Sequence, residues 1–159
     1  MDPILPESAK KRVGDIMTTN VVKVGPDTPV HEIARLMSLH AISGIPVVDD
    51  KNRVLGVVTE LDMIVRNSRF KVPNFIMILD SIIYFETPQH FRERLTHMLG
   101  VMAKEIMSQP AVTITPDATI EELATLMVER RKNPLPVVEN EQLVGIISRS
   151  DIIRLMAQE

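Results

Sequence analysis

Short apolar runs alternate along this chain with segments whose apolar residues recur at helical spacing. Residues 21–24 form a β-branched run that ends at Gly25-Pro26, which is typical of a strand. Thr28-Pro29 then predicts a helix start, and the apolar positions 30, 33, 34 and 37 share one helix face. Two further apolar runs, 45–48 and 54–58, flank a polar turn and predict a hairpin. A second helix is expected from Asp62, so the segment is predicted to fold as β-α-β-β-α.

The same pattern occurs twice, which is the most informative feature of the chain. Residues 15–18 read Asp-Ile-Met-Thr and residues 105–108 read Glu-Ile-Met-Ser, while 45–49 (Ile-Pro-Val-Val-Asp) match 135–139 (Leu-Pro-Val-Val-Glu). The offset is 90 residues at Pro46 and Pro136, and 89 at Asp62 and Asp151 after a one-residue deletion. We expect a lead segment at 1–12, a first unit at 13–66 and a second unit at 101–159.

The segment between the two units, residues 67–100, has no counterpart in either repeat. Apolar residues at 75, 78, 79 and 82 fit one face of a helix, and Thr87-Pro88 predicts the start of a second helix. We therefore expect a helical insertion. Its apolar face is expected to pack on the protein itself or at a dimer interface, rather than on a different protein.

Composition and charge narrow the class of protein. The chain has 159 residues, of which 45% are hydrophobic and 25% charged, and its net charge of −3 offers no basic field for nucleic acid. Cysteine is absent, so thiolate catalysis and disulfides are excluded. The apolar run 75–85 contains Asp80 and is about half the ~20 residues that a membrane-spanning helix needs. With no secretory signal visible, we expect a soluble cytoplasmic protein with no membrane partner.

Three motifs recur in order in both repeats: Asp/Glu-Ile-Met-Thr/Ser, a segment ending in Pro-Val-Val-Asp/Glu, and Gly-x-x-Thr/Ser-x-x-Asp. They lie at 15–18, 43–49 and 56–62, and again at 105–108, 133–139 and 145–151. Each repeat resembles a CBS domain, and the resemblance covers about 13–66 and 101–155. It implies an α/β (α+β) fold in which two β-α-β-β-α units pack sheet to sheet with pseudo-twofold symmetry. It also implies two symmetry-related clefts and assembly into a homodimer.

The residues of the third motif suit ligand binding. Thr59 and Ser148 each precede a helix, where free N–H groups favour phosphate, and Asp62 and Asp151 in the first turn can accept hydrogen bonds from ribose hydroxyls. The resemblance implies these same roles. An isolated Asp at a helix start is usually explained as a cap or as a partner of the helix dipole, whereas the CBS resemblance favours ligand binding.

The resemblance further implies an apolar slot for adenine, built from the loop before the first strand, the strand itself and the residues that lead to Pro-Val-Val. The implied ligand is an adenine nucleotide (AMP, ADP or ATP) or S-adenosylmethionine, bound as a regulatory ligand with no cofactor required. The candidate nucleotide-binding residues are Met17, Val22, Ile42, Ser43, Ile45, Pro46, Thr59, Asp62, Val112, Lys132, Asn133, Pro136, Ser148, Arg149, Ser150 and Asp151.

The two expected clefts differ in sequence. Arg149 and Ser150 lie beside Asp151, whereas Glu60 and Leu61 lie beside Asp62, and Glu60 would repel phosphate. These differences favour a cleft built from Ser148, Ser150 and Asp151 of the second unit with Met17, Val22 and Ser43 of the first. The basic run 130–132 is explained equally well as a source of phosphate charge or as a solvated helix end.

The sequence also bears on two other kinds of function. An enzyme finds no support, because the four histidines (31, 40, 90 and 97) form no metal-ligand motif and no phosphate loop or nucleophile elbow is present. We therefore expect no catalytic residue and no metal site. A ligand-free CBS dimer with a structural or partner-binding role would share the fold and differ only in the clefts. For the nucleotide-binding module and for the ligand-free dimer alike, the expected partners include a regulated protein.

Overall fold

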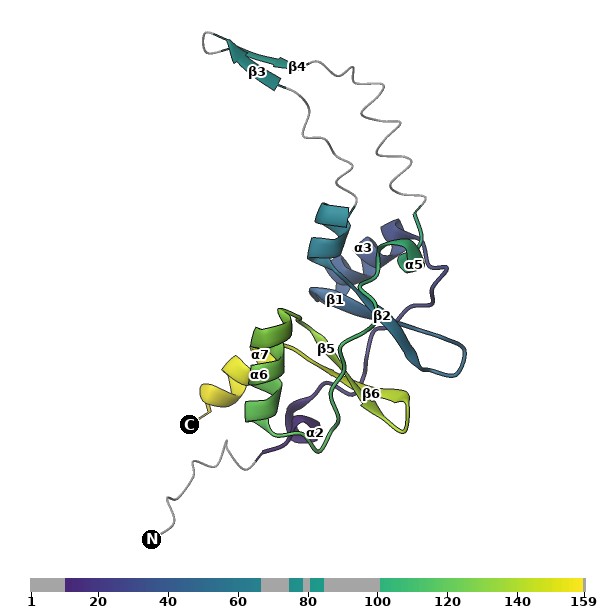
Figure 1. Cartoon of the computed structure of the whole chain (residues 1–159), viewed down its shortest axis with the longest axis vertical. Coiled ribbons are helices and arrows are strands. Elements are labelled where there is room, and N and C mark those ends of the chain that lie inside the picture. Colours follow the sequence, from purple (N-terminus) through teal and green to yellow (C-terminus); the bar gives the residue numbers. More distant parts are fainter. Residues whose placement is uncertain (1–10, 67–74, 79–80, 85–100, 159) are drawn as a thin grey trace.

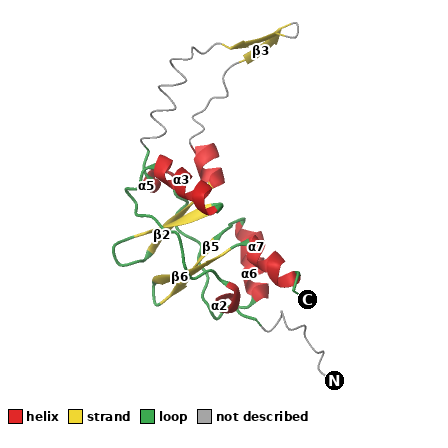
Figure 2. Cartoon of the chain, turned by 180° about the vertical axis from the view of Figure 1, so that it is seen from behind, coloured by secondary structure: helices red, strands yellow, loops and turns green. Residues whose placement is uncertain are grey.

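A computed structural model describes residues 11–66, 75–78, 81–84 and 101–158 (Figure 1). The first repeat comprises α2 (Val13–Ile16), α3 (Val30–His40), β1 (Gly44–Val48), β2 (Val54–Thr59) and η1 (Asp62–Arg66), the last wound as a π-helix. The second repeat comprises α5 (Ala103–Ile106), α6 (Ile120–Arg130), β5 (Leu135–Glu139), β6 (Gln142–Ile147) and α7 (Arg149–Met156). Figure 2 shows each strand pair with its helices, and the two halves of the molecule repeat each other.

Each repeat contains an antiparallel hairpin with the same register. Pro46 pairs with Val57 in β1–β2, Pro136 pairs with Ile146 in β5–β6, and both hairpins have a bulge just after the buried valine that follows the proline. The expected first strand of each repeat is shorter than its sequence suggested. It is reduced to one parallel bridge, Val24 to Val47 and Ile114 to Val137, because only these residues reach the edge of the hairpin.

The starts of the two long helices differ slightly. In α6 the Thr119 hydroxyl accepts a hydrogen bond from the Glu122 amide at 3.0 Å, and the Glu122 carboxylate accepts one from the Thr119 amide at 2.7 Å. This is the capping box that the spacing of Thr and Glu favours. In α3 the N-cap residue is Pro29, so the predicted start at Thr28 was one residue early.

The two repeats exchange their first helical turns, because each turn is buried in the hydrophobic core of the other repeat. Val13 of α2 is fully buried in the core of the second repeat, among residues that include Leu123, Val137 and Ile147. Conversely, Ala103 and Ile106 of α5 are buried in the core of the first repeat. Each hydrophobic core is therefore built from residues of both repeats.

Backbone hydrogen bonds fix this exchange. The Gly14 amide donates to the Pro116 carbonyl at 2.8 Å, and the Ala103 amide donates to the Thr28 carbonyl at 2.8 Å. After each turn the chain crosses the hairpin of the other repeat, where Thr18 bridges Ile146 and Ser108 bridges Val57.

Glycine in each hairpin makes room for the crossing chain. A Cβ on Gly56 would lie 2.8 Å from both the Met107 sulfur and the Ser108 carbonyl oxygen. A Cβ on Gly145 would likewise collide with Met17, and its distance to the Thr18 carbonyl oxygen would be 3.2 Å. The glycine of the third sequence motif is thus explained by the close approach of the other repeat's backbone.

The expected first helix of the insertion was wrong. Residues 75–84 contain two paired strands, β3 (Phe75–Ile78) and β4 (Ser81–Tyr84), with Phe75 opposite Tyr84. Nearly every position of this run is apolar, so it satisfies a helical and a strand period alike, and its isoleucines and aromatic residues favour a strand. The second expected helix, starting at Thr87-Pro88, lies outside the described residues. Among the described helices, none has both the length and the apolarity needed to cross a membrane.

The exchanged core predicts a specific pattern of energetic coupling. Val13→Ala should lower the free energy of unfolding by about 2 kcal/mol, because it removes two buried methyl groups. Ile33 and Ile147 are both fully buried, one in each core, so Ile33→Val and Ile147→Val form a matched pair. In urea unfolding, the effects of Val13→Ala and Ile147→Val on the free energy of unfolding should be coupled by at least about 0.5 kcal/mol. The effects of Val13→Ala and Ile33→Val should be additive. Coupling to Ile33 instead would contradict the exchange.

Candidate functional site

Two cavities lie where the two repeats meet. The cavity that contains Asp62, here called the Asp62 cleft, has a volume of about 250 Å³, and the one that contains Asp151, the Asp151 cleft, has about 260 Å³. The Asp62 cleft is lined by Ser43, Val57, Thr59, Glu60, Leu61, Asp62, Ser108, Pro110, Ala111, Val112, Arg131, Lys132, Asn133, Pro134 and Arg149. The Asp151 cleft is lined by Thr18, Asn20, Val22, Ala41, Ile42, Ser43, Gly44, Pro134, Ile146, Ile147, Ser148, Ser150, Asp151 and Arg154.

The lining residues of the two clefts occupy equivalent positions of the repeats. Asp62 corresponds to Asp151 and Val112 to Val22, and each cleft combines a helix start of one repeat with the crossing segment of the other. Ser43 and Pro134 line both clefts, so they form the wall between them.

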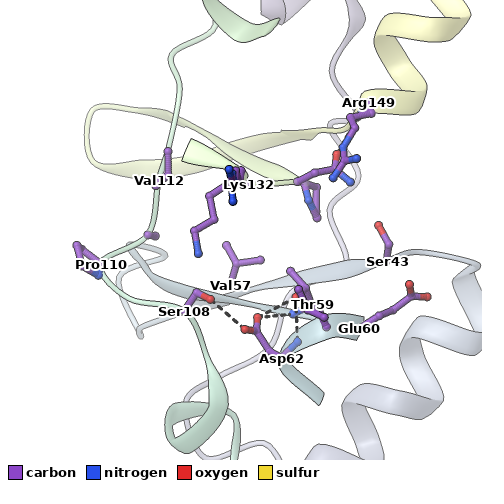
Figure 3. A pocket seen from close by; sticks show the side chains of 15 residues that line it. Ser43, Val57, Thr59, Glu60, Asp62, Ser108, Pro110, Val112, Lys132 and Arg149 are labelled. Carbon is purple, nitrogen blue, oxygen red and sulfur yellow. Dashed lines mark hydrogen bonds between the residues drawn. The ribbon is translucent and has the colours of Figure 1, made fainter. Parts of the chain in front are cut away.

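Asp62 is almost fully buried and accepts hydrogen bonds from Thr59 and Ser108 (Figure 3). Its Oδ2 accepts hydrogen bonds from the Thr59 amide at 3.0 Å and the Thr59 hydroxyl at 2.9 Å. Its Oδ1 accepts one from the Ser108 hydroxyl at 3.1 Å. Ser108 belongs to the second repeat, so this carboxylate joins the two repeats at the floor of the cleft.

Asp151 repeats the first half of this arrangement. Its Oδ2 accepts hydrogen bonds from the Ser148 amide at 2.7 Å and the Ser148 hydroxyl at 2.9 Å. The Ser148 and Ser150 hydroxyl oxygens lie 2.6 Å apart, within hydrogen-bonding distance. The second half differs, because Asp151 Oδ1 accepts its hydrogen bond from Arg154 Nη1 at 3.0 Å within the same helix.

These contacts bear on both interpretations of the two aspartates. Capping alone accounts for one oxygen of each carboxylate, because each accepts the amide of the residue before the helix. The other oxygen, Oδ1, faces a hydroxyl or guanidinium donor that also lines the cleft. Such a donor can reorient toward a ligand, so Oδ1 can exchange a protein partner for the hydroxyl of a bound molecule.

The structure distributes the basic residues differently from the sequence-based interpretation. Arg149, next to Ser150 in sequence, lines the Asp62 cleft together with Arg131 and Lys132. Arg149 is the first residue of α7, and its amide donates a hydrogen bond to Asn133 Oδ1 at 2.8 Å. This contact holds Arg149 beside Asn133, which also lines the Asp62 cleft. Arg154 is the basic residue that lines the Asp151 cleft.

The candidate residues from the sequence fall into three groups. The Asp62 cleft brings together Ser43, Thr59, Asp62, Val112, Lys132, Asn133 and Arg149. The Asp151 cleft brings together Val22, Ile42, Ser43, Ser148, Ser150 and Asp151. The remaining candidates line neither cavity: Met17 packs against the core of the second repeat, and Ile45, Pro46 and Pro136 are buried in their hairpins.

Sequence reasoning also missed several lining residues. Ser108 and Thr18 close the first repeated motif, and their matched hydroxyls were a usable signal. Pro134 and Arg154 carried no such signal, because neither has an identical residue in the other repeat. Within the part of the chain that the structure describes, no three His, Asp or Glu residues are grouped so that they could hold a metal ion.

Comparison with known proteins identifies the repeats. The family model of the CBS domain matches residues 13–67 and 103–158. An uncharacterised protein of Methanocaldococcus jannaschii, MJ1426, is 28% identical over 152 residues, which cover 91% of this chain and 90% of that protein. Other curated relatives are longer, and the chain spans 61% of one and 32% of another.

Solved structures agree with the fold. The structure of CBSX2, a protein of Arabidopsis thaliana, in complex with AMP has a TM-score of 0.68 at 24% identity, covering 93% of this chain and 97% of that chain. The CBS domain pair of MJ0100, in complex with 5′-methylthioadenosine and S-adenosyl-L-methionine, has a TM-score of 0.68 at 21% identity, covering 93% and 97%. With both repeats matched in sequence and in structure, the chain belongs to the CBS domain family.

Proposed function

We propose that this chain is a regulatory module of the cytoplasm that binds an adenine nucleotide (AMP, ADP or ATP) or S-adenosylmethionine and catalyses no reaction. The observation that carries the proposal is the pair of clefts. Each contains a buried carboxylate at a helix start, a hydroxyl three residues before it, and an apolar wall from the other repeat.

These features suit the parts of an adenosine compound. A carboxylate oxygen can accept hydrogen bonds from vicinal ribose hydroxyls, and Val112 or Val22 with Ile42 offers apolar surface to a purine. Cavities of about 250 Å³ lie just below the roughly 300–1,000 Å³ of most small-molecule sites, which suits a ligand of nucleoside size. The AMP bound to CBSX2 and the adenosine compounds bound to MJ0100 support the same ligand class.

Thermal melting with AMP, ADP, ATP and S-adenosylmethionine, each added separately, tests the proposal. A ligand at 100 times its dissociation constant should stabilise the folded protein by about 2.7 kcal/mol, because it binds the folded state alone. Asp62→Asn and Asp151→Asn should each weaken binding in one cleft, with exposed Asp50→Asn as the control. Protein freed of co-purified small molecules that shows no shift with any of these compounds would contradict nucleotide binding.

A signalling module also needs a surface that changes when the ligand binds. We propose that this surface is the interface of a homodimer. Among the described residues, six large apolar side chains on or beside the helices are more than 60% exposed: Leu39, Leu61, Ile64, Val128, Ile153 and Met156. Ile64 and Ile153 are equivalent positions of the two repeats and are 70% and 64% exposed. The same surface supports the alternative function, a ligand-free CBS dimer that binds a regulated protein.

Sedimentation velocity tests the dimer. The wild-type chain should sediment as a dimer, and Ile64→Lys with Ile153→Lys should produce monomers, because two charges would be buried at the interface in each chain. Lys51→Glu, in the turn between β1 and β2, is the control and should leave the dimer intact. A wild-type monomer at every concentration would contradict the proposal.

A further inference from the structure

The two clefts are equivalent in position and different in charge. Arg131, Lys132 and Arg149 line the Asp62 cleft. Their counterparts in the first repeat are Ala41, Ile42 and Glu60, of which Ala41 and Ile42 line the Asp151 cleft. Two of the three positions that provide cations to one cleft therefore provide apolar surface to the other.

The lining of the Asp62 cleft contains more cations than carboxylates. Within the described residues, no salt bridge joins Arg131, Lys132 or Arg149 to an acidic side chain. Figure 3 shows Lys132 extending across the cavity toward the side where Val57 and Ser108 lie, while Arg149 lies at the opposite wall. Glu60 and Asp62 are the acidic residues of the lining, so the cations outnumber them by three to two.

The Asp151 cleft offers an anion much less. Its basic lining residue is Arg154, whose guanidinium is held by the Asp151 carboxylate at 3.0 Å. Two amides at the start of α7 are occupied, since Ser148 donates to Asp151 and Arg149 donates to Asn133, and the equivalent amides of Thr59 and Glu60 are occupied as well. A negatively charged ligand in this cleft would lie near the Asp151 carboxylate, and the cation that lines the cleft, Arg154, is already paired with that carboxylate.

Resting on the proposed function, we propose that the two clefts divide adenosine ligands by charge. The Asp62 cleft binds adenosine 5′-phosphates and favours the polyphosphates, because Arg131, Lys132 and Arg149 can each contact a phosphate oxygen. The Asp151 cleft binds adenosine compounds whose 5′ substituent carries no negative charge. One chain would then respond separately to a nucleotide and to an uncharged nucleoside.

The pseudo-symmetry provides a matched exchange of residues as the test. Ala41 and Arg131 both have a left-handed backbone with φ of 51° at the end of equivalent helices, so each position accepts the other's side chain. Arg131→Ala/Lys132→Ile removes the charges from the Asp62 cleft. Ala41→Arg/Ile42→Lys installs them in the Asp151 cleft. All four residues are exposed or half-buried, so both variants should fold, and thermal melting without ligand checks this.

Isothermal titration with ATP and with 5′-methylthioadenosine, which has no phosphate, gives the readout. For the wild type we expect one ATP site, weakened by raising the salt to about 0.5 M, and one salt-insensitive 5′-methylthioadenosine site. Arg131→Ala/Lys132→Ile should weaken ATP binding at least about tenfold through the loss of charged hydrogen bonds, and change 5′-methylthioadenosine binding less than about threefold. Ala41→Arg/Ile42→Lys should create a second ATP site.

Three results would overturn the inference, and they are separable from failure of the proposed function. ATP binding that is unchanged in Arg131→Ala/Lys132→Ile would exclude those cations as phosphate contacts. Equal loss of both probes would show a structural effect in place of charge selection. Two ATP sites of equal affinity in the wild type would show no division between the clefts. In all three cases an adenosine compound still binds. The proposed function itself would be overturned only if AMP, ADP, ATP and S-adenosylmethionine all fail to bind.

Discussion

The exchange of leading turns between the two cores is the constraint on which the rest of this structure depends. Val13 fills the core of the second repeat and Ile106 fills that of the first, so neither hydrophobic core is complete without the other repeat. The hydrogen bonds from Gly14 to Pro116 and from Ala103 to Thr28 fix the position of each turn. Because burial of apolar surface is the main favourable term in folding, the repeats are expected to fold as one cooperative unit.

The clefts are a consequence of this exchange. After its turn, each crossing segment bridges the hairpin of the other repeat, at Thr18 with Ile146 and at Ser108 with Val57. This brings Ser108 within 3.1 Å of the Asp62 carboxylate, which the other repeat supplies. The chemistry of the candidate site therefore arises between the repeats, and a change in the crossing segments would alter a cleft and a core together.

Much of the fold could be predicted from the sequence, because the same pattern of apolar and polar residues occurs in both repeats. The hairpins, the long helices and the aspartates at the helix starts all follow from spacing. The exchange of first turns could not be predicted, because nothing in the sequence of an apolar turn such as 13–16 indicates in which core it is buried.

From its place in the sequence, Arg149 was expected beside Asp151. Successive residues of a helix point about 100° apart, however, and Arg149 lines the other cleft. The strands at 75–84 were missed because a nearly continuous apolar run has no period to read.

The exchanged turns also bear on how such a molecule can arise. In a chain with a single repeat, the first turn could not pack into that repeat's own core in this way. Both would be buried only if two copies of the chain exchanged their first turns. Its assembly would then depend on concentration. Joining two repeats in one chain makes the trade intramolecular, at the effective concentration set by the connecting segment. It also frees the two copies to diverge, as Ala41-Ile42 and Arg131-Lys132 have done on the walls of the two clefts.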